Sequence, residues 1–539
     1  MKRHSLLITA IAFVLIPALF LQGCFFLPPP SDPVQAEQNN TPEDNEPPPE
    51  EPRQVKPPVH GKFTLRYDPN SSLNPLTALN RDNILLSSLM YESLFVLDGK
   101  FNAEPVLCER WSTSDNVTFS LEIRPNIPMS DGSLLTAEDV AYSLRQAMLR
   151  GRYVNRFSTV ASVAADGPMT VTVELYAPNN RFTRLLDIPI IKSGQIDYRV
   201  PVGSGPYVYA GTEEMRLDSF AGHRDFMRLP ISTIYLKECN DSELTSLFDD
   251  GELSLITDDP YDAFDIRLNR LHDTRYYDTT TIQFIGFNAN SMVLRDSDVR
   301  RAIGCAVDRQ FIVENIMPRH TIAAPLALSP GFDLYDVEWE YRNLTPLQEM
   351  AILLDRAGLS DFDQDSFLEL HDGFGGYSKF SLEFIVNSDN SHKVRAAHTI
   401  ADALRRNGLN IIVRELPWDR YTNALQIGDF DMYYGETMLG ADFNLSPLLL
   451  PGPLNYGRTA SSDYRPLIEA FLGARDDGVV QWAAKRLCDE ITIRAPFIPI
   501  LYKRYAVFSP MGAISDASPS QSSVFRNITE WTIDTTLLN

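Results

Sequence analysis

The sequence predicts a mixed fold of α-helices and β-strands, and two kinds of periodicity support that prediction. Hydrophobic residues alternate with polar ones at Val117–Ile123 and Val171–Leu175, a period of two that is typical of half-buried strands. Between these segments, residues 136–147 carry apolar side chains at helical spacing behind an approximate capping box at Thr136 and Asp139. Strand and helix signals are therefore interspersed, which predicts the α/β class.

The first 23 residues have the parts of a secretory signal peptide. A short basic start precedes a nearly unbroken apolar run, Leu6–Leu21, which is shorter than the roughly 20 residues of a comfortable membrane span. The run ends in Leu21-Gln22-Gly23-Cys24, which resembles the lipobox of bacterial lipoproteins. That resemblance implies diacylation of Cys24, and two acyl chains anchor a protein stably. We expect a signal peptide at 1–23 and an extracytoplasmic protein lipid-anchored at the cell membrane; a plain signal peptide or a single spanning helix is the alternative.

Residues 24–60 are interpreted as a tether. Between Phe25 and His60 there are eleven prolines, seven acidic residues and two basic ones. A segment of this composition cannot bury enough apolar surface to fold, and it favours extended, polyproline-like conformations. We expect it to hold a folded body away from the membrane.

The chain carries a formal net charge of -23 and contains no familiar catalytic motif. An acidic surface repels phosphate backbones, so we expect no nucleic-acid partner. There is no GxSxG elbow, GxxxxGK phosphate loop, HExxH pair or GxGxxG turn, and the eight histidines are scattered. We therefore expect a protein that is not an enzyme and that has no cofactor and no bound metal.

Two later helices and one strand are marked by their ends. Thr345-Pro346-Leu347-Gln348 predicts a helix start, with a capping residue, a proline and a glutamine in the favoured positions, and Gly358 ends that helix. A second helix is predicted from about Ser391 to Asn407, ended by Gly408 and followed by a strand at Ile411–Leu416.

Four cysteines besides Cys24 are far apart and show no metal-ligand spacing: Cys108, Cys239, Cys305 and Cys488. Two disulfides could form in an oxidising compartment, and buried free thiols fit the sequence equally well. Their state stays open at this point.

An acidic loop follows the helix that ends at Gly358. If Asp361 is position one of a twelve-residue calcium loop, Asp363 and Asp365 fall at positions three and five. Glu369 and Asp372 then fall at positions nine and twelve. Calcium binds such oxygens, but a calcium loop needs glycine at position six, where this chain has Ser366. A solvated acidic loop is therefore preferred, and calcium binding stays the alternative.

Short motifs occur in a fixed order along the body of the chain. They are Tyr91–Asp98, Arg110-Trp111-Ser112, Ser130-Asp131-Gly132, Leu135–Val140, Val202–Tyr207, Phe287-Asn288, Asp298–Ile303, Asp308-Arg309, Gly428–Asp431, Ala441-Asp442-Phe443 and Ala495–Tyr502. No single motif is decisive, but their order and spacing resemble the family-5 extracellular solute-binding proteins, the peptide- and nickel-binding proteins of ABC importers. The resemblance covers essentially the whole body from about Leu65.

The resemblance implies a two-lobed, periplasmic-binding-protein-like (flytrap) fold with an extra domain inserted in the first lobe. Mapped onto this chain, the first lobe comprises 61–80, 193–280 and 503–539, the inserted domain 81–192, and the second lobe 281–502. Hinge strands are expected near 282–288 and 498–505. Such lobes capture a ligand by closing over it.

The resemblance also implies site residues. In peptide-binding members of the family, an aspartate before an aromatic residue pairs with the peptide's α-ammonium group, and Asp442 before Phe443 matches that position. The other expected ligand-binding residues are Gly440, Ala441, Trp418, Phe287, Asn288 and Tyr502. The chain departs from the family at Leu439, where tryptophan is frequent, and in a longer stretch before it that carries Glu436. Alternatively, Asp442 caps a helix or turn near Asn444.

The function implied is that of a substrate-binding lipoprotein that captures short peptides and delivers them to an ABC permease and its ATPase. Another solute, such as a nickel chelate or an oligosaccharide, is the alternative within transport. A surface receptor or adhesin with the same fold is the alternative outside transport, because a fold does not settle a function.

Overall fold

The computed structural model describes residues 62–258, 266–318, 320–343, 346–371, 373–458 and 461–538. The chain divides into two compact units, 1–54 and 55–539, and all described residues belong to the second. The predicted signal peptide and tether, together with Cys24, Thr345 and Asp372, lie outside the described residues. None of the helices in the described ranges combines the length and apolar character that a membrane crossing requires.

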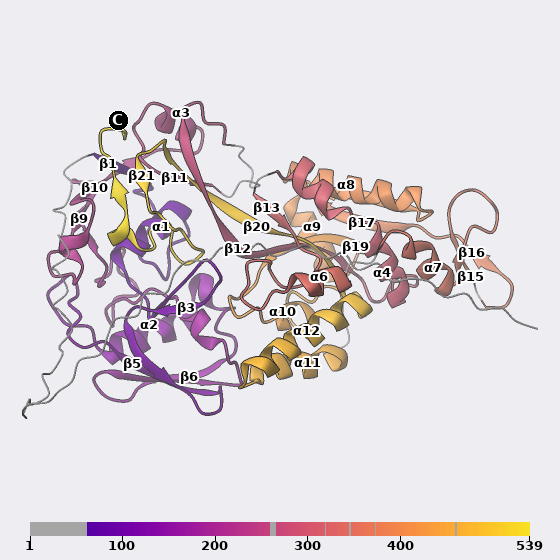
Figure 1. Cartoon of the computed structure of the whole chain (residues 1–539), viewed down its shortest axis with the longest axis horizontal. Coiled ribbons are helices and arrows are strands. Elements are labelled where there is room, and N and C mark those ends of the chain that lie inside the picture. The colour runs from indigo at the N-terminus through magenta and orange to yellow at the C-terminus, as the bar shows by residue number, and fades with distance from the viewer. Residues whose placement is uncertain are drawn as a thin grey trace, which may run out of the picture. The chain divides into compact units, whose positions relative to one another are not determined.

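One four-stranded sheet has the order β1-β10-β9-β8 (Figure 1). Its strands are β1 (Phe63–Tyr67), β8 (Tyr207–Tyr209), β9 (Arg216–Ser219) and β10 (Thr233–Glu238). β1 pairs parallel with β10, and the other neighbours pair antiparallel. Helix α1 (Arg81–Met90) contacts β1 and β8, and Asn80 caps it by accepting a hydrogen bond from the backbone N–H of Asn83.

The Gly203–Tyr207 turn lies against the end of α1. The backbone N–H of Gly205 donates to the carbonyl of Met90 at 2.9 Å. A Cβ at Gly205 would lie 2.3 Å from the Met90 carbonyl carbon, so only glycine permits this approach. The motif is a structural turn that fixes α1 against the sheet.

A second four-stranded sheet, β4-β5-β7-β6, is antiparallel throughout. Its strands are β4 (Cys108–Ser112), β5 (Thr118–Ile123), β6 (Val160–Ala165) and β7 (Thr170–Leu175). Helix α2 (Ala137–Leu149) covers β6 and β7, and its reciprocal capping box at Thr136 and Asp139 is confirmed. A short hairpin, β2 (Phe95–Leu97) and β3 (Ala103–Pro105), stands beside it. Both sheets contribute to one hydrophobic core.

A seven-stranded sheet has the order β11-β20-β12-β19-β17-β18, with β13 added on β20. Its strands are β11 (Ile256–Asp258), β12 (His272–Phe287), β13 (Thr321–Ala323), β17 (Leu382–Asn387), β18 (Ile411–Leu416), β19 (Met432–Met438) and β20 (Phe497–Pro510). The predicted strand at Ile411–Leu416 is thus confirmed. The interspersed strands and helices confirm the mixed α/β prediction.

Helices surround the β17–β19 part of this sheet in two hydrophobic cores. They are α4 (Ser297–Cys305), α5 (Arg309–Phe311), α6 (Val337–Asn343), α7 (Glu349–Arg356), α8 (Ser391–Arg406), α9 (Trp418–Ile427), α10 (Ser446–Leu449), α11 (Ser461–Gly473) and α12 (Asp477–Arg494). The predicted helix before Gly408 is α8. Helix α7 begins three residues later than the predicted start at Pro346, which leads into a turn before it. Smaller elements are α3 (Leu244–Asp249), β14 (Leu359–Ser360), β15 (Glu369–His371), β16 (Tyr377–Ser378), β21 (Ile514–Ser515) and β22 (Thr532–Ile533).

The two longest strands, β12 and β20, run antiparallel and join the two halves of the body (Figure 1). Their register shifts between Asp278 and Ile282, so the pairing is interrupted at 279–281. We call β12 and β20 the hinge strands. The first lobe is the described residues up to Asp258 and after Pro510, and the second lobe is the described residues between the hinge strands. The finer boundaries of lobes and inserted domain stay predictions.

Candidate functional site

Asp442 lies in a tight turn after β19 and is only 3% exposed. Its Oδ2 accepts a hydrogen bond from Asn179 Nδ2 of the first lobe at 2.8 Å, and its Oδ1 accepts one from the backbone N–H of Asn444 at 3.3 Å. Burial raises the pKa of Asp442, and the bond from Asn179 offsets part of that shift. Asp442 therefore caps the local turn and also joins the two lobes.

The neighbours of Asp442 shape this turn. A Cβ at Gly440 would lie 2.4 Å from Asp442 Oδ1, so glycine allows the carboxylate to fold back on the chain. Ala441 is buried, and the Phe443 ring packs against Phe332 with ring centroids 4.1 Å apart. Phe443 adopts a left-handed φ of 53°, which reverses the chain here.

The remaining predicted residues lie elsewhere in the second lobe or the hinge. Phe287 is 2% exposed in a hydrophobic core, and Asn288 donates to the carbonyls of Gly428 and Phe430. The Tyr502 hydroxyl donates to the Ala327 carbonyl at 2.8 Å. Trp418 is 56% exposed at the start of α9 and stacks on Tyr421. The structure does not bring these four side chains together with Asp442 in one cavity; their ligand contacts stay predictions.

A cavity of about 420 Å³ lies where the first lobe, the hinge strands and the end of β19 meet. Helix α1 lines one side, and the segment from Arg152 to Arg156 lines another. The rest of the lining includes Tyr277 and Tyr505 of the hinge strands, Met438 of β19 and the loop 520–524. Its volume falls within the roughly 300–1,000 Å³ typical of small-ligand sites.

The charge of this lining is positive although the whole chain is acidic. Its charged side chains are three guanidinium groups, of Arg81, Arg152 and Arg156, and one carboxylate, of Asp187, so the net charge is +2. Arg81 lies over the Tyr505 ring at 5.1 Å from its centroid. Burial alone would lower the pKa of Arg156, but its ion pair with Asp187 raises it, so this guanidinium stays charged.

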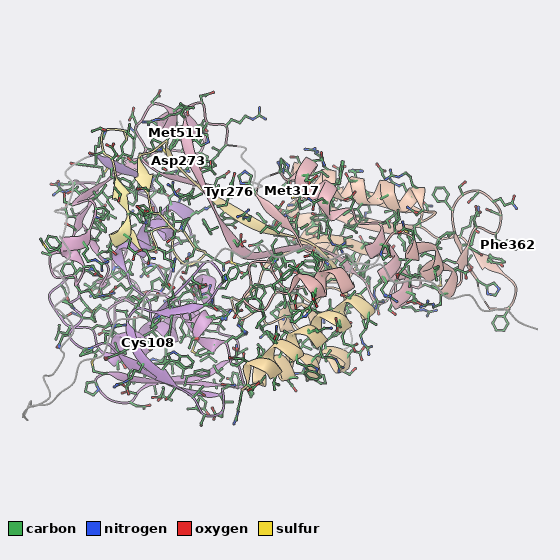
Figure 2. All side chains as sticks on the ribbon, viewed as in Figure 1. Cys108, Asp273, Tyr276, Met317, Phe362 and Met511 are labelled. Carbon is green, nitrogen blue, oxygen red and sulfur yellow. The ribbon has the colours of Figure 1, made fainter. Side chains whose placement is uncertain are left out.

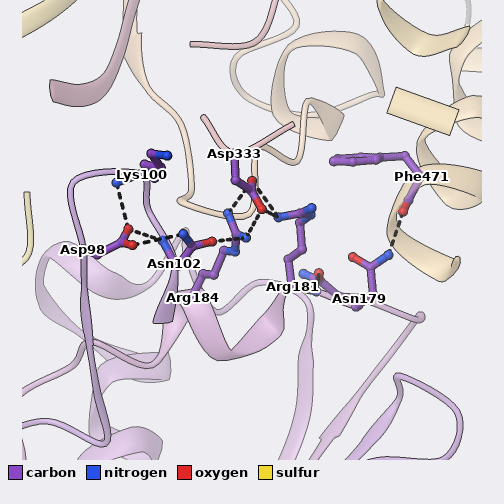
Figure 3. A network of polar contacts seen from close by, with 9 residues as sticks. Asp98, Lys100, Asn102, Asn179, Arg181, Arg184, Asp333 and Phe471 are labelled. Carbon is purple, nitrogen blue, oxygen red and sulfur yellow. Dashed lines mark hydrogen bonds and ion pairs between the residues drawn. The ribbon is translucent and has the colours of Figure 1, made fainter. Parts of the chain in front are cut away.

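At another contact between the lobes, two arginines of the first lobe form ion pairs with one aspartate of the second (Figure 3). Arg184 Nη2 lies 2.8 Å from Asp333 Oδ2, and Arg181 Nη1 lies 3.2 Å from Asp333 Oδ1. Arg184 also donates to Asn102 Oδ1 at 2.9 Å. Both guanidiniums lie over the Phe332 ring. We call Arg181, Arg184 and Asp333 the interlobe clamp.

A second set of interlobe contacts centres on Asn180. Its backbone N–H donates to the Leu472 carbonyl at 2.7 Å. Its side-chain amide donates to the carbonyls of Phe471 and Ala474, at 3.0 and 2.9 Å. The two lobes are thus in direct contact through Asn180 and through the interlobe clamp.

Sequence reasoning missed the arginines of the cavity and the clamp. The motifs that carry the resemblance include none of these arginines, which are separated along the chain by up to 103 residues, from Arg81 to Arg184. Two local signals of positive charge were present: Arg152 and Arg156 lie four residues apart, and Arg181 and Arg184 lie three apart.

Comparison with known proteins gives a consistent result. The model of the bacterial extracellular solute-binding proteins, family 5 Middle, matches residues 102–451. The oligopeptide-binding protein AppA of Bacillus subtilis is 20% identical over 376 residues, covering 64% of this chain and 67% of AppA. The glutathione-binding protein GsiB of Escherichia coli is 23% identical over 262 residues, covering 45% of this chain and about half of GsiB, 51%.

Solved structures share the fold. The substrate-binding protein CtaP of Listeria monocytogenes superposes with a TM-score of 0.71 at 19% identity, covering 89% of this chain and 100% of CtaP. AppA of B. subtilis, solved with a nonapeptide, gives a TM-score of 0.63 at 18% identity, with coverages of 89% and 100%. These likenesses establish the two-lobed architecture.

Proposed function

Because this chain belongs to family 5 of the bacterial extracellular solute-binding proteins, we propose that it captures short peptides by lobe closure for an ABC importer. The positively charged cavity at the hinge carries this proposal. It has a suitable volume, and its arginines offer charge-assisted hydrogen bonds to a peptide's carboxylate. The likeness to AppA and GsiB, named for binding oligopeptides and glutathione, supports the peptide class.

The charges near the cavity suit both ends of a peptide. Arg81 and Arg152 would hold the carboxylate. Asp442, whose pKa responds to the nearby Arg156 of the lining, would receive the α-ammonium group in place of the Asn179 amide. Arg81 and Arg152 belong to the first lobe and Asp442 to the second, so a peptide can reach all three only when the lobes are close together. It would favour that arrangement through its differential affinity for it.

No covalent chemistry on the peptide is part of this function. The closed body would present its cargo to a membrane permease with its ATPase, acting as a monomer. Diacylated Cys24 and the proline-rich segment at 24–60 would hold the body at the outer face of the membrane. Substitution Cys24→Ala should release the protein from washed membranes, and retention equal to that of the parent chain would rule the anchor out.

The peptide proposal is tested by competition. The full chain is incubated with an equimolar mixture of one tripeptide in free, N-acetylated and C-amidated forms, for a panel of tripeptides, and the retained forms are quantified by mass spectrometry. We expect each modified form to be retained at least about tenfold less than the free one, a difference of about 1.4 kcal/mol. No retention of any tripeptide would remove the peptide assignment.

Two variants test the recognition of each end of the peptide separately. Asp442→Asn should reduce the preference for a free N-terminus, and Arg81→Met should reduce the preference for a free C-terminus. Glu122→Gln, on an exposed strand pair, is the matched control and should leave both preferences unchanged. If Asp442→Asn weakens free and acetylated peptides equally, Asp442 holds the lobes together and does not bind the ligand.

A further inference from the structure

The loop between β14 and β15 brings together oxygens suited to a divalent cation. Asp361, Asp363 and Glu369 each offer a carboxylate oxygen, and these atoms lie within 4.8 Å of one another. Oxygens that each lie about 2.4 Å from one calcium ion are at most about 4.8 Å apart. The spacing therefore fits a single calcium ion.

Glu369 supplies an observation independent of the acidic cluster. Its side chain is only 3% exposed, and its Oε1 is buried without a hydrogen-bond partner among the described residues. Its Oε2 accepts from the backbone N–H of Phe362 at 2.9 Å, which holds the carboxylate in the loop. A buried carboxylate oxygen without a partner is costly, and a bound cation would satisfy it.

The backbone of the loop makes the sharp turn that a calcium loop needs at position six, although this chain has no glycine there. Ser366 adopts a left-handed φ of 77°, so a serine makes the turn for which glycine is usual at position six. The backbone N–H of Ser366 donates to Asp361 Oδ2 at 3.1 Å, and that of Asp365 donates to Asp363 Oδ1 at 3.2 Å. These bonds aim the carboxylates of the loop at its centre.

Lys379 is the competing cation. Its Nζ lies 2.5 Å from Asp363 Oδ2 and 2.6 Å from Asp365 Oδ2, and these contacts raise the pKa of Lys379. Its side chain is 63% exposed, so it can leave Asp363 without opening the fold. Against four carboxylates, including those of Asp361 and Glu369, one ammonium group leaves a net charge of -3.

We propose that the loop 361–369 binds one calcium ion through Asp361, Asp363 and Glu369, with Lys379 released from Asp363 and retained by Asp365. Calcium would fasten the small sheet β14-β15-β16, where the exposed Phe362 ring stacks on Tyr377 with ring centroids 3.8 Å apart. Figure 2 shows Phe362 at the end of the body that carries this sheet. The role of the site is structural and does not depend on the peptide proposal.

The test is calorimetric titration of the EDTA-treated full chain with calcium chloride, alongside its melting temperature. We expect binding with a Kd at or below about 1 mM, the weak end for extracellular calcium modules, and a rise in melting temperature. Asp361→Asn and Glu369→Gln should each weaken calcium binding at least about tenfold, because affinity follows ligand charge. Glu213→Gln, at an exposed turn, should bind as the parent does.

Lys379→Met tests the calcium site independently, including the case in which Glu369→Gln does not fold. Removal of the competing ammonium should tighten calcium binding several-fold, whereas a permanent structural role for Lys379 predicts a lower melting temperature with no calcium response. Absence of binding in the parent chain overturns the proposal. Equal binding of magnesium, which requires stricter octahedral geometry, overturns the assignment to calcium.

Discussion

The charge of the Asp333 carboxylate affects the contact between the two lobes. This carboxylate meets two guanidiniums whose side chains are each 9% exposed. Burial and the neighbouring Arg184 lower the pKa of Arg181 to about 10, so Arg181 remains charged at neutral pH. Without Asp333, two like charges would stay buried and unpaired, which is strongly unfavourable.

Substitution Asp333→Asn should therefore open or loosen the lobes. We expect the free energy of unfolding to fall by about 3 kcal/mol, the lower end for breaking a buried ion pair. The radius of gyration from small-angle scattering should rise. Glu122→Gln breaks the exposed pair with Arg110, which solvent screens, and should lower the stability far less. Equal losses in the two variants would show that the interlobe clamp is not a special contact.

The clamp also predicts acid sensitivity. Burial alone would raise the pKa of Asp333, but its bonds to Arg184 and Arg181 hold that pKa below the usual 3.8. The stabilisation is thus present above the unfolded-state pKa and is lost as pH falls through the folded-state value. Scattering should show opening of the parent chain below about pH 4. Asp333→Asn should lack this transition, and its persistence in that variant would assign it to other groups.

Among single residues, the sequence predicted a role for Asp442 but did not indicate its hydrogen-bond partner, Asn179. Order along the chain placed Asp442 in a family motif, whereas its bond to Asn179 joins residues 263 positions apart. The clamp arginines and the cavity arginines are likewise set by tertiary packing. Side chains that meet only across lobes leave no local pattern from which to predict them.

Among the elements, the hinge strands depend on close contact with β19. Gly286 of β12 is the register partner of Tyr433 of β19. A Cβ at Gly286 would lie 2.1 Å from the Tyr433 ring, which therefore covers the glycine. The ring is itself packed against Phe284 and Phe430, so it has little room to move.

Gly286→Ala should therefore destabilise the hinge sheet by about 2 kcal/mol or more, the range for an overpacked core. Gly99→Ala is the matched control, because a methyl group at Gly99 would meet no atom within 4 Å outside the neighbouring residues and should cost little. Denaturant unfolding measures both. A Gly286→Ala protein as stable as the parent would mean that Tyr433 relaxes freely.

Element prediction succeeded where local signals are strong. The capping box at Thr136 fixed the start of α2, and Gly408, with φ of 91°, follows the end of α8. The start of α7 was predicted too early, since Pro346 and Leu347 form a turn whose carbonyls accept from Glu349 and Met350. Helix ends depend on tertiary context more than helix existence does.

For the whole molecule, the four cysteines of the described body are all free and buried. Burial raises the pKa of Cys108 and Cys488 to about 12 and that of Cys305 to about 11, so their thiolates are scarce. We expect a reductant to leave the melting temperature unchanged. A thiol reagent should react with all four only after denaturation, and a reductant-dependent fall in melting temperature would reveal a disulfide.

The whole architecture was predictable because many weak motifs in order constrain a fold together, although each alone is indecisive. The contact between the lobes was not predictable, since it depends on side chains such as Asn180 and Asp333 that carry no sequence signature. The cavity could not be predicted either, because the residues that line it come from segments far apart in the sequence.

The most direct measurement is mass spectrometry of small molecules released when the purified full chain is denatured. A body that holds a ligand in a cavity with a net charge of +2 should carry cargo through purification. We predict short peptides with both termini free. Reproducible release of a sugar or a metal chelate, or of no small molecule after exposure to peptides, would contradict the account.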